Sequence, residues 1–167
     1  SYPDPLRMAL FLEKLGVDGI TAHLREDRRH MLDNDIAKLI SEIKLPINLE
    51  MAATREMQSI ALKLKPRAVC LVPERREERT TEGGLDVISQ KDWLVSFLSP
   101  LIESNIRVSI FVSPELEQID AAHQIGAPVV ELNTGAFCDL YHDNDLEGHN
   151  REMHKLRTSA IHASDLG

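Results

Sequence analysis

Apolar residues recur at intervals of three and four positions in several stretches of the chain, with polar residues between them. A stripe with this period is typical of an amphipathic helix that packs one face against a core. Pro5 suits a first helical turn, Asp33 and Thr54 are typical N-caps, and Gly16 suits the position after a helix. The pattern predicts helices whose stripes cover residues 8–15, 36–43, 57–64 and 94–101, with further helices over 113–126 and 145–166.

Short apolar runs lie between these helices, and each is too brief to form a helix of its own. They cover residues 19–24, 47–51, 68–72, 108–112 and 129–132. Runs of this length that alternate with helices are typical of a parallel sheet built from βαβ units, whose strands are covered on both faces. The sequence therefore predicts an α/β fold with five parallel strands.

Two architectures fit this alternation, a doubly wound sheet and a (β/α)8 TIM barrel. A dinucleotide-binding doubly wound sheet carries G-x-G-x-x-G after its first strand, whereas here the first strand leads into the charged segment 23–30. The barrel is favoured, although a closed barrel has eight strands and this chain begins with a helix. We expect residues 1–167 to be a single barrel domain that is incomplete at both ends, with about five of the strands.

Composition narrows the class of protein further. A length of 167 residues allows one ordinary domain, and with 4% aromatic residues its core must be mainly aliphatic. The net charge of −8 opposes any general affinity for nucleic acid or an anionic membrane surface. No apolar run approaches the roughly 18 residues that a membrane span needs, and no signal peptide is recognisable. We expect a cytoplasmic protein.

Cysteine and histidine spacing gives no indication of a metal site. Cys70 and Cys138 form no C-x-x-C motif, and we expect both to be buried, reduced thiols. The four histidines toward the C-terminus do not share a helical face at the i, i+4 spacing of a metal-binding pair; they are His142, His149, His154 and His162. They are interpreted as surface residues, and no metal is predicted.

Ionisable residues stand where three of the predicted strands end. His23 and Arg25 follow the first strand, Glu50 ends the second, and Glu131 ends the fifth. In a parallel α/β fold the active site lies at the carboxyl ends of the strands, where a histidine that faces two carboxylates could act as a general base or proton shuttle. A strand-end polar residue that merely caps a helix or meets solvent is the alternative.

Two segments have the composition of a phosphate site. Residues 23–30 hold three arginines and two histidines, and the planar arginine side chain matches phosphate oxygens, although Glu26 and Asp27 could instead pair with these cations. The connection 73–86 is long for this fold and contains Thr80 and the pair Gly83-Gly84. Such loops are often lids or binding loops, and a plain surface loop is the alternative. We predict that this loop closes over a bound phosphate ester.

Six strings of residues give the chain a close resemblance to a known family. They are Asp18-Gly-Ile-Thr-Ala-His-Leu-Arg-Glu-Asp-Arg-Arg-His30, Asn48-Leu-Glu-Met-Ala52, Cys70-Leu-Val-Pro-Glu74, Thr80-Thr-Glu-Gly-Gly-Leu-Asp86, Gly126-Ala-Pro128 and Glu131-Leu-Asn-Thr-Gly135. In these strings, and in order over essentially the whole chain, the sequence resembles the pyridoxine 5′-phosphate synthases of vitamin B6 biosynthesis. The resemblance implies a (β/α)8 barrel that assembles as a homo-octamer and needs no cofactor. It also implies a transferase that condenses 1-deoxy-D-xylulose 5-phosphate with 3-amino-2-oxopropyl phosphate to give pyridoxine 5′-phosphate, phosphate and water.

The resemblance also implies roles for individual residues. His23 and Glu50 match the family's catalytic proton acceptors, and Glu131 matches a carboxylate that stabilises the transition state. The residues that match positions holding deoxyxylulose phosphate are Arg25, His30 and Thr80. Imine formation, dehydration, phosphate elimination and ring closure all move protons, which such side chains accept and return.

The chain departs from the family pattern in two ways. Asn133 stands where the family usually has a histidine, which we expect to tune the site rather than abolish it. The substrate-binding residues of the family's first strand, and the second catalytic histidine and Gly-His phosphate site of its last strands, have no counterpart within residues 1–167. Two other functions therefore remain open: a non-catalytic fragment or phosphate-binding module of such a barrel, and a different phosphate-handling barrel enzyme.

Overall fold

Five parallel strands alternate with helices in the computed structural model, which describes residues 3–74 and 83–167. The elements are α1 (Pro5–Leu15), β1 (Ile20–His23), α2 (Asp33–Glu42), β2 (Ile47–Met51), α3 (Arg55–Leu64), β3 (Ala68–Leu71), α4 (Lys91–Glu103), β4 (Arg107–Val112), α5 (Leu116–Gln124), β5 (Val129–Leu132), α6 (Gly135–His142) and α7 (Leu146–Leu166). The five predicted strands are all present.

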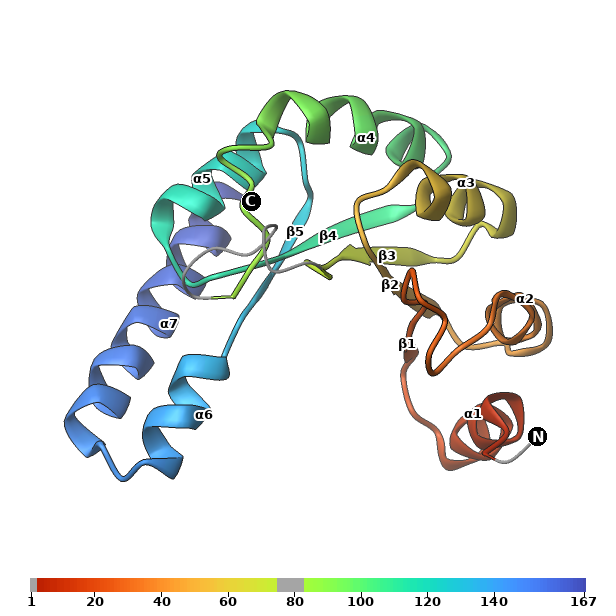
Figure 1. The fold of residues 1–167 in the computed structure, drawn as a ribbon, viewed down its shortest axis with the longest axis horizontal. Helices are drawn as coiled ribbons and strands as arrows, with labels where there is room; N and C mark the ends of the chain where they lie inside the picture. The colour runs from red at the N-terminus through yellow and green to blue at the C-terminus, as the bar shows by residue number, and fades with distance from the viewer. Residues whose placement is uncertain (1–2, 75–82) are drawn as a thin grey trace.

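The strands lie side by side in the order in which they occur in the chain, β1-β2-β3-β4-β5, and every neighbouring pair is parallel. A doubly wound sheet reverses its strand order at a switch point, which puts helices on both of its faces. Without a reversal, right-handed crossovers put every connecting helix on the same face. The fold is therefore an arc of a TIM barrel, with the helices outside and an open concave side (Figure 1).

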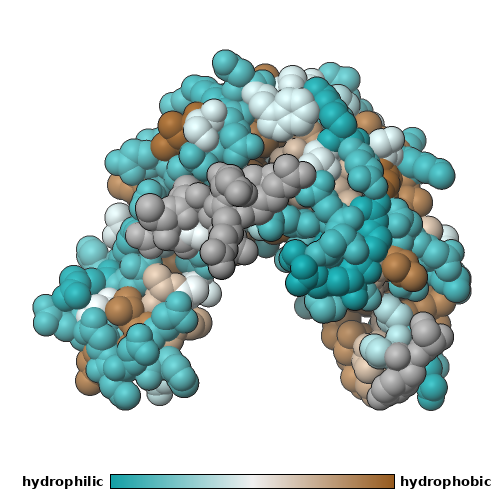
Figure 2. Space-filling model, viewed as in Figure 1, coloured by the Kyte–Doolittle hydropathy of each residue, from teal (hydrophilic) through white to brown (hydrophobic). Residues whose placement is uncertain are grey.

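The hydrophobic core lies between the convex face of the sheet and the helices. Alternate strand residues point to this side, because successive side chains of a strand face opposite ways. They include Leu49 on β2, Val69 on β3 and Ile110 on β4, all with 0% exposure, and they pack with the buried stripes of α2, α3 and α4. The other alternate positions face the hollow of the arc, which is visible between its two ends in Figure 2.

Two helix starts differ from the sequence prediction. Asp33 is the first residue of α2 rather than its N-cap, because its carboxylate pairs with Arg28, while the carboxylate of Asp35 accepts the backbone N–H of Leu32. The helix predicted from Ser113 begins only at Leu116. The Pro114 carbonyl accepts the hydroxyl of Ser159 on α7 at 2.7 Å, which holds residues 113–115 in a turn.

Helix α6 has no counterpart in the sequence prediction. It has only 8 residues and begins with a glycine, so it is too short for the repeated apolar pattern that marks the other helices, and none of its residues is fully buried. Helix α6 packs beside the long helix α7, and α7 also contacts α5 and β5 (Figure 1). In the described part of the chain, no helix is both long enough and apolar enough to span a membrane.

At Gly84 the backbone packs closely against the backbone at the end of β4. A Cβ atom built on Gly84 would lie 2.1 Å from the backbone nitrogen of Ser113 and 2.5 Å from the carbonyl carbon of Val112. The neighbouring Leu85 N–H donates to the Phe111 carbonyl at 2.8 Å. Only glycine allows two backbone segments to approach this closely.

We predict that Gly84→Ala lowers the free energy of unfolding by about 3 kcal/mol, because two backbones must separate to admit the methyl group. Gly16→Ala is the matched control. Gly16 has φ +81° but nothing within 4 Å of an added Cβ. Gly16→Ala should therefore lower the free energy of unfolding by only about 1 kcal/mol, through backbone strain. Chemical denaturation of both variants measures the difference. Equal losses would contradict the close contact at Gly84.

Candidate active site

His23 and Glu50 lie side by side at the carboxyl ends of β1 and β2. The parallel register pairs His23 with Glu50, and both side chains point to the concave side. The Nδ1 atom of His23 lies 3.6 Å from Oε2 of Glu50, and the two side chains are 29% and 31% exposed. The next residue, Leu24, is completely buried and donates its N–H to the Glu50 carbonyl, which fixes the end of β1. A substrate can therefore reach both groups.

Glu74 is a second carboxylate beside His23, and no role for it was predicted from the sequence. Its Oε1 lies 3.0 Å from Nε2 of His23, and its Oε2 accepts the backbone N–H of Glu26 at 2.9 Å. Its side chain is only 5% exposed. The available signal was its position, three residues after the fully buried strand β3 and directly after Pro73.

Glu131 lies farther along the concave face, at β5. Its Oε1 accepts the hydroxyl of Ser109 on β4 at 2.6 Å, and that hydroxyl also lies 3.3 Å from the Val69 carbonyl. Cys70 on β3 lies between Glu50 and Ser109 in the register of the sheet. His23 thus has Glu50 and Glu74 as its carboxylate neighbours, and Glu131 belongs to a separate group with Ser109.

The Cys70 thiol is unsuited to nucleophilic chemistry. Burial raises the pKa of Cys70 far above its ordinary value; a hydrogen bond from Ser109 lowers it in part, and the charges of Glu131 and Glu50 raise it further. Only the thiolate is a strong nucleophile. Cys138, in contrast, is exposed on α6, so the expectation that both thiols are buried is wrong for Cys138. Its helix has no fully buried residue, and Cys138 lies outside the half-buried positions 136, 137 and 140.

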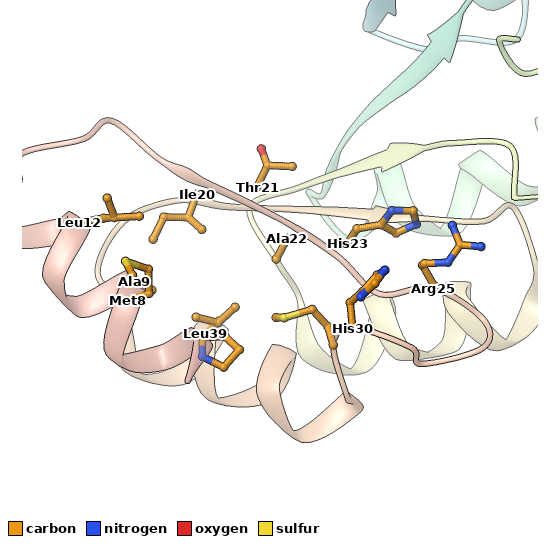
Figure 3. A pocket seen from close by; sticks show the side chains of 12 residues that line it. Met8, Ala9, Leu12, Ile20, Thr21, Ala22, His23, Arg25, His30 and Leu39 are labelled. Atoms are coloured by element: carbon orange, nitrogen blue, oxygen red, sulfur yellow. The ribbon is translucent and has the colours of Figure 1, made fainter. Parts of the chain in front are cut away.

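Arg25 and His30 line one cavity together with His23. The cavity has a volume of about 370 Å³; these three side chains form its polar end, and residues of α1 and α2 form its apolar end (Figure 3). The Arg25 Nε lies 3.4 Å from a carboxylate oxygen of Asp27, and among the described residues this loose contact leaves other guanidinium N–H groups for a ligand. Thr80 and most of the predicted lid fall within 75–82, outside the described residues.

Arg28 holds the loop that carries Arg25 and His30. It has a positive φ of 52°, donates to the Glu26 carbonyl at 2.8 Å, and pairs with Asp33 on α2 and Glu56 on α3. The hydrogen bond with Asp33 raises the pKa of Arg28 and, in return, lowers the pKa of Asp33. Asp27 is tied to Arg29, whose hydrogen bond lowers the pKa of Asp27 to about 2. Asp27 therefore pairs with Arg25 and Arg29, as the alternative interpretation expected, but Arg25 keeps its place in the cavity.

The remaining polar candidates either make structural contacts or are exposed. The Asn133 Oδ1 accepts the backbone N–H of Gly135 at 2.8 Å, at the start of α6. His162 on α7 forms a hydrogen bond with Asp120 on α5. The ring centres of His149 and Phe137 lie 4.0 Å apart. His142 and His154 are exposed. Over residues 3–74 and 83–167, no group of three His, Cys, Asp or Glu side chains is arranged to hold a metal ion.

Known proteins are similar to this chain over essentially its whole length. A sequence model of the family described as "Pyridoxal phosphate biosynthesis protein PdxJ" matches residues 1–167. The chain belongs to the PdxJ family. It is 56% identical over 167 residues to the pyridoxine 5′-phosphate synthase of Roseobacter denitrificans, covering 100% of this chain and 67% of that protein. The corresponding protein of Ruegeria pomeroyi is 54% identical, with 99% and 67% covered. That of Rhodospirillum rubrum is 56% identical, with 99% and 66% covered.

This PdxJ chain spans about two thirds of the length of the relatives it matches. Its five strands and their helices are consistent with a partial TIM barrel. Within that arc, a histidine between two carboxylates adjoins a cavity with an arginine and a second histidine. Such an arrangement can bind an anionic group and move protons beside it.

We predict that the two thiols of the chain differ sharply in reactivity. At about pH 8, iodoacetamide should modify Cys138 rapidly and leave Cys70 unmodified, because Cys70 is buried and its thiolate is disfavoured by its carboxylate neighbours. Peptide mass spectrometry over time measures both rates. In guanidinium chloride the rates should converge. Equal rates in the native protein would show that Cys70 is not enclosed as described.

Proposed function

We propose that the full-length protein is a pyridoxine 5′-phosphate synthase, a transferase of vitamin B6 biosynthesis. Its substrates are 1-deoxy-D-xylulose 5-phosphate and 3-amino-2-oxopropyl phosphate, and its products are pyridoxine 5′-phosphate, phosphate and water. The observation that carries this proposal is the pairing of His23 with Glu50 at adjacent strand ends, with Nδ1 and Oε2 3.6 Å apart. This pair lies next to the cavity lined by Arg25 and His30. The relatives that the chain resembles are named pyridoxine 5′-phosphate synthases, which supports the same conclusion.

Acid–base chemistry is the core of the proposed mechanism. Imine formation, loss of water, loss of phosphate and ring closure each need a proton removed from one atom and delivered to another. His23 and Glu50 accept these protons and return them in later steps. Glu131 stabilises charge that develops in the transition state, and its bond to Ser109 orients it. These steps require no redox cofactor or metal.

Substrate binding is assigned to the basic residues of the first loop. Arg25 and His30 hold the phosphate of deoxyxylulose phosphate, and both line the same cavity as His23. Both side chains follow β1 on the segment that Arg28 braces. Thr80 is proposed as a further contact to the same substrate. Assembly as a homo-octamer and a cytoplasmic location also remain predictions.

The first test of this function is substitution of the proposed proton acceptors. In the full-length enzyme, His23→Asn and Glu50→Gln should each lower turnover by roughly 10²–10⁴-fold, because a positioned acid–base group contributes about that factor. Release of inorganic phosphate that depends on both substrates measures the rate. The free energy of unfolding should change little in Glu50→Gln, whose side chain is 31% exposed. It should fall somewhat in His23→Asn, because the buried Glu74 loses its hydrogen-bond partner.

His154→Asn and Glu147→Gln are matched controls. They make the same chemical changes at exposed positions of α7 and should leave turnover unchanged. Near wild-type turnover in both site variants would refute the assignment of His23 and Glu50. Absence of phosphate release by the wild-type enzyme would refute the proposed function itself.

A further inference from the structure

Glu74 combines deep burial with contacts to two hydrogen-bond donors. Its side chain is 5% exposed, whereas that of Glu50, on the other side of the same imidazole, is 31% exposed. We propose that Glu74 is a positioning residue that holds His23 as the Nε2–H tautomer, so that Nδ1 is the nitrogen that accepts protons from the substrate. This inference rests on the proposed function and names the atom that performs its proton transfers.

The hydrogen bonds of Glu74 determine the tautomer. An ionised carboxylate only accepts hydrogen bonds, with both oxygens. Oε2 accepts the backbone N–H of Glu26 at 2.9 Å, and Oε1 faces the Nε2 atom of His23 at 3.0 Å. Nε2 must therefore carry a hydrogen to donate. In the neutral imidazole the other nitrogen then has a lone pair.

Nδ1 is placed to use that lone pair. It lies 3.6 Å from Oε2 of Glu50, on the side of the ring where the carboxylate is open to solvent. When Nδ1 takes a proton from the substrate, Nε2 keeps its own, and the imidazolium lies between two carboxylates. Both stabilise its positive charge until Nδ1 passes the proton on. Glu74 itself neither gains nor loses a proton in this cycle.

Burial explains why Glu74 positions the histidine and Glu50 does not. A carboxylate that is 5% exposed and bonded at both oxygens has little freedom to rotate, and the dry surroundings strengthen both hydrogen bonds. The same side chain ties the loop that carries Arg25 to the end of β3, because Glu26 follows Arg25 directly. Glu74 thus fixes the proton acceptor relative to the proposed phosphate site.

The test compares variants of Glu74 in the full-length enzyme. Glu74→Leu removes both acceptor oxygens at similar volume, so the proton of neutral His23 should move to Nδ1, facing Glu50. Glu74→Gln keeps one acceptor oxygen for two donors, so it should give a mixture of the two tautomers. Glu103→Gln, whose parent side chain bonds only to the nearby Ser99 among the contacts described, is the control for the loss of charge.

Solid-state NMR of ¹⁵N-histidine-labelled protein reads the tautomer directly, with the His23 signals identified by their loss in His23→Asn. Wild type and Glu103→Gln should show the Nε2–H form. Turnover should fall roughly 10²-fold in Glu74→Leu and less in Glu74→Gln, in proportion to the remaining Nε2–H population. The KM for deoxyxylulose phosphate reports separately on any disturbance of the loop.

Three results would overturn the inference: an Nδ1–H tautomer in the wild type, an unchanged tautomer in the variants, or a changed tautomer with unchanged turnover. If Glu74→Leu does not fold, the Glu74→Gln variant decides, because a wild-type tautomer there refutes the proposal. Failure of the proposed function would look different. The wild-type enzyme would then release no phosphate, whatever the state of His23.

Discussion

The strict sequential order of the parallel strands is the constraint on which the rest of this structure depends. Right-handed crossovers without a reversal put every connecting helix on the convex face, so the alternate side chains of each strand have a core to fill on that side only. The other alternate positions are free to be polar. The same constraint brings all strand carboxyl ends to one edge, which is where His23 and Glu50 meet.

On the concave face, one row of residues at paired register positions is mainly polar. His23, Glu50, Cys70 and Ser109 follow one another across four neighbouring strands, and Glu131 of the fifth strand reaches Ser109. Each of these side chains is anchored by a strand whose opposite face is buried in the core. Rigid strands hold functional groups with less error than loops do. The phosphate-binding candidates Arg25 and His30 lie on a loop, and that loop is braced by Arg28 and by Glu74.

Most of the fold was predictable from periodicity, because each strand is a short apolar run and most helices carry a clear apolar stripe. The start of α5 was not, because Ser113-Pro114 is a common helix start and only tertiary contacts with Ser159 and Gly84 hold it as a turn. Helix α6 was missed because it has only 8 residues, too few for a repeated apolar pattern. The pairing of His23 with Glu50 followed from strand ends that meet at one edge.

The role of Glu74 could not be predicted, because its partner His23 is 51 residues away and its position in the loop gives no period to recognise. The distance between the ends of β1 and β5, which have three strands between them, could not be predicted from the sequence either. For this reason the second carboxylate beside His23 was expected to be Glu131, and the structure has Glu74 there instead. The sequence pattern predicts which residues stand at the carboxyl edge of the sheet, but only the folded structure determines which of their side chains are in contact.

A crystal structure of the full-length protein with deoxyxylulose phosphate tests the central claim, that this edge of the arc binds a phosphate ester beside a proton acceptor. The account predicts phosphate oxygens within hydrogen-bond distance of Arg25 and His30, and a substrate carbon or hydroxyl within reach of Nδ1 of His23 and the carboxylate of Glu50. The opposite, amino-terminal edge of the sheet also has a cavity, lined by Asn48, Arg67 and Arg107. Substrate bound there, with the His23 edge empty, would contradict the account.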